Sequence, residues 1–151
     1  MVFDKRLAKT FIGGLAALGL TVSIAQADAV TDRQATMKQV GDSMKALAAI
    51  AKGEAAFDAA VVKSNGEKLA KLFETAKGLF PPGSETGEKE TWAKPEIWQD
   101  KDTFLKIMDD GIAASTTLAA VAAEDGLRPA LGNLGNNGCK ACHEKFRRPK
   151  E

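Results

Sequence analysis

The spacing of apolar residues is the feature that most constrains the fold of this 151-residue chain. From residue 28 onward, apolar side chains recur at steps of three and four, the spacing of one face of an α-helix. No segment sustains the apolar–polar alternation of a half-buried strand. Alanine, lysine, glutamate and leucine dominate, and all four are favourable or tolerated in helices. The chain is therefore expected to be all-α.

Four helical stretches are predicted, at about 31–51, 58–80, 101–123 and 127–148. The long connection PPGSETGEKETWAKPEIWQD lies between the second and third, and its prolines and glycines exclude continuous helix. Two short connections and one long one between amphipathic helices predict an antiparallel four-helix bundle. Asn65-Gly66 weakens the middle of the second helix, where a kink is one expectation. The first helix is predicted to bury one seam: Val30, Met37, Gly41, Met44, Ala48 and Ala51.

The first 27 residues are typical of a secretory signal peptide. Lys5, Arg6 and Lys9 precede the apolar run FIGGLAALGLTVSI, and the small-residue sequence AQA follows. The run is shorter than the roughly 20 residues of a membrane-spanning helix, which argues against an anchor. Cleavage is expected after Ala27, leaving one domain at 28–151 with no membrane insertion.

Charge and motif content exclude several function classes. The formal net charge is +1, so nothing electrostatic favours nucleic acid or an anionic membrane as a partner. The chain has one histidine, no glycine-rich phosphate loop and no nucleophile elbow. These observations indicate a protein that is not an enzyme.

The chain's two cysteines and its one histidine all lie in the C-terminal sequence NNGCKACHEKFRRPKE. A Cys-x-x-Cys pair serves redox exchange, zinc binding or covalent haem attachment. On a helix, Cys139, Cys142 and His143 share one face, which suits two thiols on the porphyrin vinyl groups and an imidazole on iron. A structural zinc site needs four ligands, and a redox pair would be expected beside a βαβ pattern. Redox exchange stays open because Lys140 could lower a thiol pKa, and so does a simple disulfide.

Three glycines precede the motif at equal spacing, Gly132, Gly135 and Gly138. If this segment is helical, they lie near one stripe and let a macrocycle or another helix approach closely. The alternative is that the helix begins after Gly135 and the glycines belong to a loop.

A C-terminal CKACHEKFR on the last of four helices resembles the class II c-type cytochromes, the cytochrome c′ family. The likeness extends from Asp28 and includes DRQATMKQVGDSMKALAAIAKG and LFPPGSETG…KPEIW. The resemblance implies a four-helix bundle, a periplasmic location, one covalent haem c, and frequent homodimers. Val40 and Leu47 are candidates for a dimer seam, although the bundle core is the more common fate of such residues.

The resemblance also assigns roles to individual residues. Cys139 and Cys142 would form the thioethers and His143 would be the proximal iron ligand. Arg147 matches a basic residue near the haem, and Arg33 matches one near a haem propionate. Phe146 stands where family members often have tyrosine.

Met37 separates two functions, because it matches the position that faces the distal side of the iron. In the low-spin branch of the family a methionine there binds iron, which implies an electron carrier with periplasmic redox partners. In high-spin members the residue only covers an open site that binds NO or CO. The pattern MK…G…M…AIAKGE favours the carrier hypothesis, with gas binding second. Met44 is a weaker ligand candidate, since methionine commonly fills cores. A third alternative is a helical bundle without haem, in which the Cys-x-x-Cys pair is incidental. This alternative predicts a colourless protein.

Overall fold

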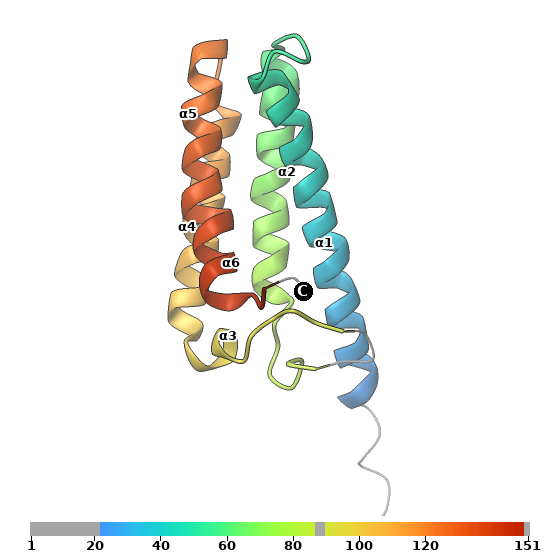
Figure 1. Cartoon of the computed structure of the whole chain (residues 1–151). Helices are drawn as coiled ribbons and strands as arrows, with labels where there is room; N and C mark the ends of the chain where they lie inside the picture. Colours follow the sequence, from blue (N-terminus) through green and yellow to red (C-terminus); the bar gives the residue numbers. More distant parts are fainter. Residues whose placement is uncertain (1–21, 87–89, 150–151) are drawn as a thin grey trace, which may run out of the picture.

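The computed structural model describes residues 22–86 and 90–149. The long helical segments lie side by side in Figure 1, each antiparallel to the next along the chain, so the predicted four-helix bundle is confirmed. In the described residues the backbone forms no strand, only an isolated bridge between Ala93 and Arg147. The elements are α1 (Val22–Ala51), α2 (Ala59–Gly78), α3 (Glu96–Gln99), α4 (Lys101–Ala119), α5 (Glu124–Leu134), the π-helical η1 (Gly135–Lys140) and α6 (Ala141–Phe146).

The starts of α2 and α4 follow from capping residues. The Asp58 carboxylate accepts hydrogen bonds from Ala60 N at 2.7 Å and Val61 N at 3.3 Å, which satisfies two otherwise free amides of α2. Asp100 caps α4 in the same way. Gly53 ends the turn after α1 in the left-handed region, at φ 78°.

The first helix differs from its prediction in extent. It begins at Val22 rather than near Thr31, so it runs through the predicted cleavage junction after Ala27. Most of the predicted signal peptide, residues 1–21, lies outside the described residues. Among the described residues, no helix is both long and apolar enough to cross a membrane.

The first helix also buries a different seam from the predicted one. Gly41 is exposed, and Met37, Met44, Ala48 and Ala51 are only half-buried. The buried stripe contains three polar residues, which is why an apolar pattern placed the face incorrectly. Val40 and Leu47 belong to the core, so the core alternative for them is confirmed and the dimer-seam alternative is wrong. The stripe comprises Val30, Arg33, Thr36, Val40, Ser43, Leu47 and Ile50.

Helices α2 and α4 cross closely because a glycine lies at their contact. A Cβ on Gly66 would lie 2.6 Å from Ala119 N, so only glycine fits this crossing. Gly66 therefore serves close packing, and α2 runs unbroken from Ala59 to Gly78. The predicted buried face of α2 is confirmed for Val62, Leu69, Leu72, Phe73 and Ala76.

The last rod, formed by α5, η1 and α6 in succession, is helical throughout but not uniformly α-helical. It begins at Glu124, and the three glycines lie within it, so the helical alternative for them is the right one. The last rod approaches α4 closely at Gly138, where an added Cβ would lie 3.1 Å from Gly111 Cα of α4. Gly132 and Gly135 have nothing within 4 Å of such a Cβ. The rod ends at Phe146 rather than Arg148, where the chain becomes extended.

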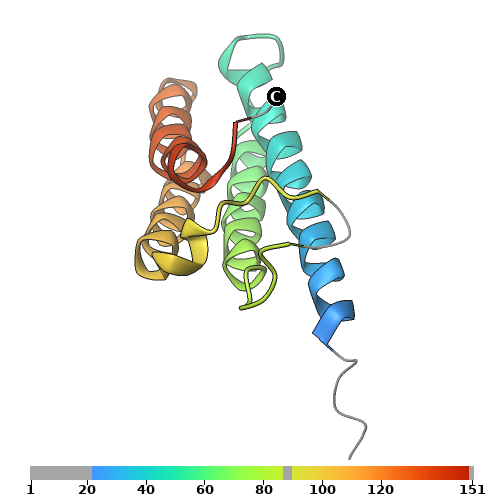
Figure 2. The same ribbon diagram turned by 60° about the horizontal axis from the view of Figure 1, so that its bottom comes forward.

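The connection between α2 and α3 packs against the bundle, as predicted, and crosses in front of α2 in Figure 2. Ile97 is buried, and Trp98 Nε1 donates to Pro81 O at 2.9 Å. The connection also pairs with the C-terminal tail: Lys94 N donates to Phe146 O at 2.9 Å and Arg148 N to Trp92 O at 2.8 Å. This short pairing joins residues 92–94 of the connection to residues 146–148, which lie just after the Cys-x-x-Cys-His motif.

Candidate functional site

The Cys-x-x-Cys-His motif spans the junction between η1 and α6. Cys139 lies near the end of the π-helical turn, whereas Cys142 and His143 lie in α6. Both cysteines are half-buried against the hydrophobic core, and His143 is exposed. The apolar core therefore reaches the thiols while the imidazole keeps a free side.

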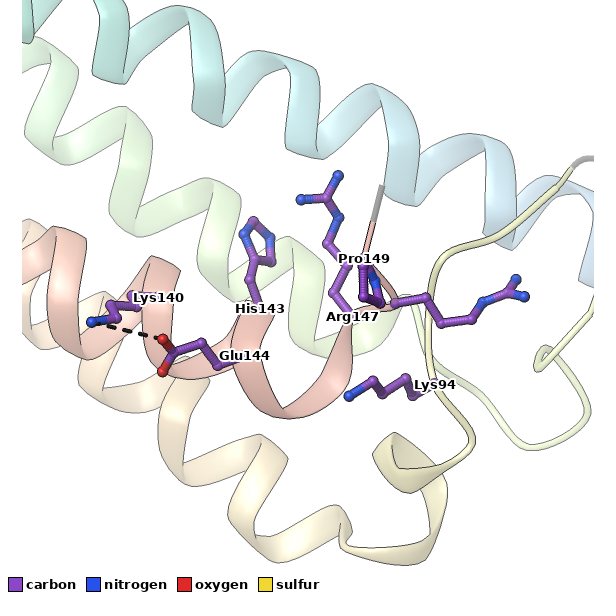
Figure 3. A pocket seen from close by; sticks show the side chains of 7 residues that line it. Lys94, Lys140, His143, Glu144, Arg147 and Pro149 are labelled. Carbon is purple, nitrogen blue, oxygen red and sulfur yellow. Dashed lines mark ion pairs between the residues drawn. The ribbon is translucent and has the colours of Figure 1, made fainter. Parts of the chain in front are cut away.

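A hollow of about 300 Å³ lies beside His143. Figure 3 shows that the side chains of His143, in α6, and of Arg147, which directly follows α6, point to the same side. The hollow is lined by four basic side chains and a single acidic one, Glu144, which pairs with Lys140 at 3.7 Å. The full lining is Lys94, Lys140, His143, Glu144, Arg147, Arg148 and Pro149.

The environment of the two thiols disfavours redox exchange. Both are free in the structure. Burial raises the pKa of Cys139, and burial together with the charge of Cys139 raises the pKa of Cys142 to about 11. A redox-active pair needs a lowered thiol pKa, because the thiolate is the nucleophile. Lys140, which could have lowered it, pairs with Glu144 instead.

The imidazole of His143 is held toward its neutral form. Partial burial lowers its pKa, and the positive charge of Arg147 lowers it further. A neutral imidazole keeps a nitrogen lone pair, which is what a metal ligand requires.

Arg33 is buried in α1, with 6% of its surface exposed. Its Nε donates to Leu79 O at 2.6 Å and one terminal nitrogen to Ser84 O at 2.8 Å and to the Ser84 hydroxyl. The guanidinium also lies over the Phe80 ring at 4.3 Å. Its other terminal nitrogen, Nη1, is buried without a hydrogen-bond partner among the described residues. An unsatisfied charged donor is expensive, so this atom is suited to an anionic ligand group.

Met37, one turn further along α1, is half-buried and packs against the core. Met44 has the same burial and packing, so burial does not distinguish the two methionines. Phe146 fills the core, edge-on to Phe104 at 5.7 Å between ring centroids.

Three features near the site were missed by sequence reasoning. Ser84 holds Arg33, Trp92 stacks on Arg147, and η1 interrupts the last helix. The first two join segments far apart in the chain. The equal spacing of Gly132, Gly135 and Gly138 was the available sign of unusual helix geometry, and it did not specify a π-helical turn.

The comparisons with known proteins agree with one another. The sequence model of the family described as Cytochrome C′ matches residues 28–147. Cytochrome c′ of Rhodopseudomonas palustris is 39% identical over 143 residues, covering 92% of this chain and 94% of the relative. Cytochrome c-556 of Agrobacterium tumefaciens strain II Chrys is 40% identical over 123 residues, covering 80% and 98%.

Solved structures give the same result. The structure of cytochrome c′ from Rhodopseudomonas palustris has a TM-score of 0.76 at 37% identity, covering 82% of this chain and 98% of that one. A ferrous arginine-to-lysine variant of the Alcaligenes xylosoxidans protein, described with bound NO, has a TM-score of 0.73 at 32% identity, covering 83% and 97%. The chain therefore belongs to the cytochrome c′ family, whose members carry covalently bound haem c.

Proposed function

We propose that this chain is a periplasmic cytochrome c′ that binds a small diatomic gas, NO or CO, at its haem. The observation that carries the proposal is the match to cytochromes c′ along residues 28–147, in a chain whose thiols and imidazole adjoin on the last rod. The solved relative described with bound NO supports this choice of ligand class. The family model and the solved relatives thus favour the gas-binding hypothesis over the carrier hypothesis.

The residues of α6 and η1 would hold the cofactor. Cys139 and Cys142 would each add sulfur and hydrogen across one vinyl double bond, which forms a thioether without a leaving group. His143 would bind the iron through its neutral imidazole. When bound, the haem would supply an iron that can take a small ligand.

Arg33 would bind a haem propionate through Nη1. Its other nitrogens already hold the backbone of Leu79 and Ser84, so the guanidinium is fixed before any ligand arrives. A carboxylate would satisfy the one buried donor that the described residues leave unpaired. Arg33→Gln is expected to weaken this anchoring, and a shift in propionate resonances in the NMR spectrum would report it.

Met37 would act as an apolar cover over the place where the small ligand binds. The second candidate function is an electron carrier in which Met37 binds iron. It is favoured by the presence of a half-buried thioether on α1 at the position that the family resemblance assigns to the distal side. The relatives named cytochrome c-556 add support, since they are as similar to this chain as the cytochromes c′.

Ferric EPR and CO binding to the reduced protein distinguish these two functions. High-spin ferric signals and ready CO binding are expected, and Met37→Leu should preserve both because leucine also covers the site. Low-spin signals that vanish in Met37→Leu would instead assign the carrier function. Met44→Leu is the matched control, and it should change neither spectrum.

Export and processing are part of the proposal. Cleavage after Ala27 is supported by the family match, which begins at residue 28. N-terminal sequencing of protein from the periplasm should begin at Asp28, and a start elsewhere contradicts the predicted site. The homodimer and the redox partners implied by the resemblance remain predictions; light scattering of the purified protein measures the first.

A further inference from the structure

Trp92 is one of two large hydrophobic side chains that the described residues expose, with 37% of its surface accessible. It lies in the connection between α2 and α3, where the backbone pairs with the C-terminal tail. Arg148 N donates to Trp92 O at 2.8 Å, and Ala93 bridges Arg147. Backbone pairing therefore fixes Trp92 beside the residues that follow α6.

The indole ring packs against the Arg147 side chain. The guanidinium carbon of Arg147 lies 4.7 Å from the centroid of the Trp92 ring, a cation–π distance. In the described part of the chain, Arg147 forms no ion pair. The ring is therefore the contact that selects a direction for this cation.

That direction brings the Arg147 charge to the motif. Arg147 and His143 line the same hollow, and their side chains point to the same side in Figure 3. The other cations of the hollow are held by partners of their own: Lys140 pairs with Glu144, Lys94 Nζ donates to Lys145 O at 3.2 Å, and Arg148 donates to Thr91 O.

We propose that Trp92 is a positioning residue that holds the Arg147 guanidinium beside His143 and thereby raises the reduction potential of the haem. The inference rests on the proposed role of His143 as the iron ligand, and it does not depend on gas binding. A fixed positive charge near the ligand favours the reduced iron, which carries one positive charge fewer than the oxidised iron. The charge acts only if it stays in place, and the ring keeps it there.

Four variants of the haem-loaded protein test this proposal. Trp92→Leu keeps apolar bulk without an aromatic face, and Trp92→Phe keeps a face. Arg147→Gln removes the charge at similar length, and the fourth variant combines it with Trp92→Leu. Val61→Ala is the control, because Val61 is the other exposed large hydrophobic residue and lies outside the hollow.

The first measurement is spectroelectrochemical titration. Arg147→Gln and Trp92→Leu should both lower the potential, Trp92→Phe should retain most of the wild-type value, and Val61→Ala should equal wild type. The double variant should match Arg147→Gln alone, because Trp92 acts through Arg147. An additive double variant, an unchanged Trp92→Leu or an unchanged Arg147→Gln overturns the proposal.

The second measurement is the NMR resonance of the Arg147 Nε–H in the reduced protein under CO, which is diamagnetic whether or not Met37 binds iron. Ring current should shift this resonance upfield in the wild type and in Trp92→Phe but not in Trp92→Leu. An equal resonance in all three shows that the stack is absent and overturns the proposal. A protein that does not bind CO would contradict the proposed function while leaving both measurements of Trp92 valid.

Discussion

Arg33 occupies a buried position in α1 and joins that helix to a loop about fifty residues later in the chain. Its contacts with Leu79 and Ser84 fix the first part of the long connection, and Ser84 is itself fully buried. Burial lowers the pKa of Arg33, and the nearby Glu85 raises it, yet a guanidinium stays charged in proteins. The charge is therefore available to an anionic group at any working pH.

Replacement of Ser84 by alanine tests how much this junction contributes. The Ser84 hydroxyl accepts from Arg33 and donates to Pro81 O at 2.7 Å, so Ser84→Ala removes both hydrogen bonds from a buried place. A loss of about 1–3 kcal/mol in the free energy of unfolding is expected in urea titrations. Thr75→Ala, which removes an exposed hydroxyl from α2, should change it by less than about 0.5 kcal/mol. Equal effects of the two substitutions would contradict the prediction.

Gly66 is the residue on which the close crossing of α2 and α4 depends. Gly66→Ala would place a methyl group 2.6 Å from the Ala119 nitrogen. Because this nitrogen belongs to the backbone of α4, it cannot rotate away from the methyl group as the end of a side chain could. Destabilisation of about 1–3 kcal/mol is expected from overpacking. Gly41→Ala is the matched control: Gly41 also lies in a helix, has nothing within 4 Å of an added Cβ, and should gain up to about 1 kcal/mol. Opposite signs in urea titrations are the expected outcome.

At the scale of elements, the π-helical turn η1 should tolerate a one-residue deletion that a regular α-helix would not. A π-helical turn contains one residue more than the α-helix it interrupts, so deleting one residue converts it to α-helix without rotating its flanks. A chain lacking Asn137 should therefore still fold and attach haem. A chain lacking Arg128, from regular α5, should turn the motif by about 100° relative to Leu127 and the start of the rod, and should lose attachment.

Haem staining of denaturing gels and circular dichroism measure these two deletions. Haem attachment in both deletion variants would show that the helical register of the last rod does not set the orientation of the motif. Loss of attachment in both would show that η1 is needed for more than its extra residue.

The elements that sequence predicted well are those defined by local rules. Helix α2 begins at Ala59, after its cap Asp58, and α4 begins at Lys101, after its cap Asp100, while the buried face of α2 follows from its apolar spacing. The cysteines and histidine were found because their spacing is itself the motif. Arg33 and Met37 came from resemblance to a family, since nothing in their spacing identified them.

The elements that sequence predicted poorly depend on partners elsewhere in the chain. The buried face of α1 was misplaced because Arg33, Thr36 and Ser43 are polar, and Arg33 is tolerated there only through Ser84 and Leu79. The end of the last rod was missed because pairing of residues 146–148 with the connection draws the backbone out of the helix. No local pattern reports a contact between segments about fifty residues apart.

At the scale of the whole molecule, packing rather than charge pairing stabilises the fold. The ion pairs of the described residues lie at the surface, apart from those of the half-buried Lys77, and the net charge of the chain is +1. Raising sodium chloride from about 0.05 M to about 0.5 M should therefore change the free energy of unfolding by less than about 1 kcal/mol. Urea titrations at the two salt concentrations measure it, and a loss of several kcal/mol would show that charge pairs stabilise the bundle after all.

The position of the motif in the chain has a consequence for the order of assembly. Synthesis proceeds from the N-terminus, so α1, α2 and α4 emerge before the Cys-x-x-Cys-His motif. Gly111 of α4 and Phe73 of α2, which contact Gly138 of η1, both precede it in the chain. Only the last helical segment, α5 to α6, then remains to dock. The segment that completes the bundle is therefore also the one that carries Cys139, Cys142 and His143.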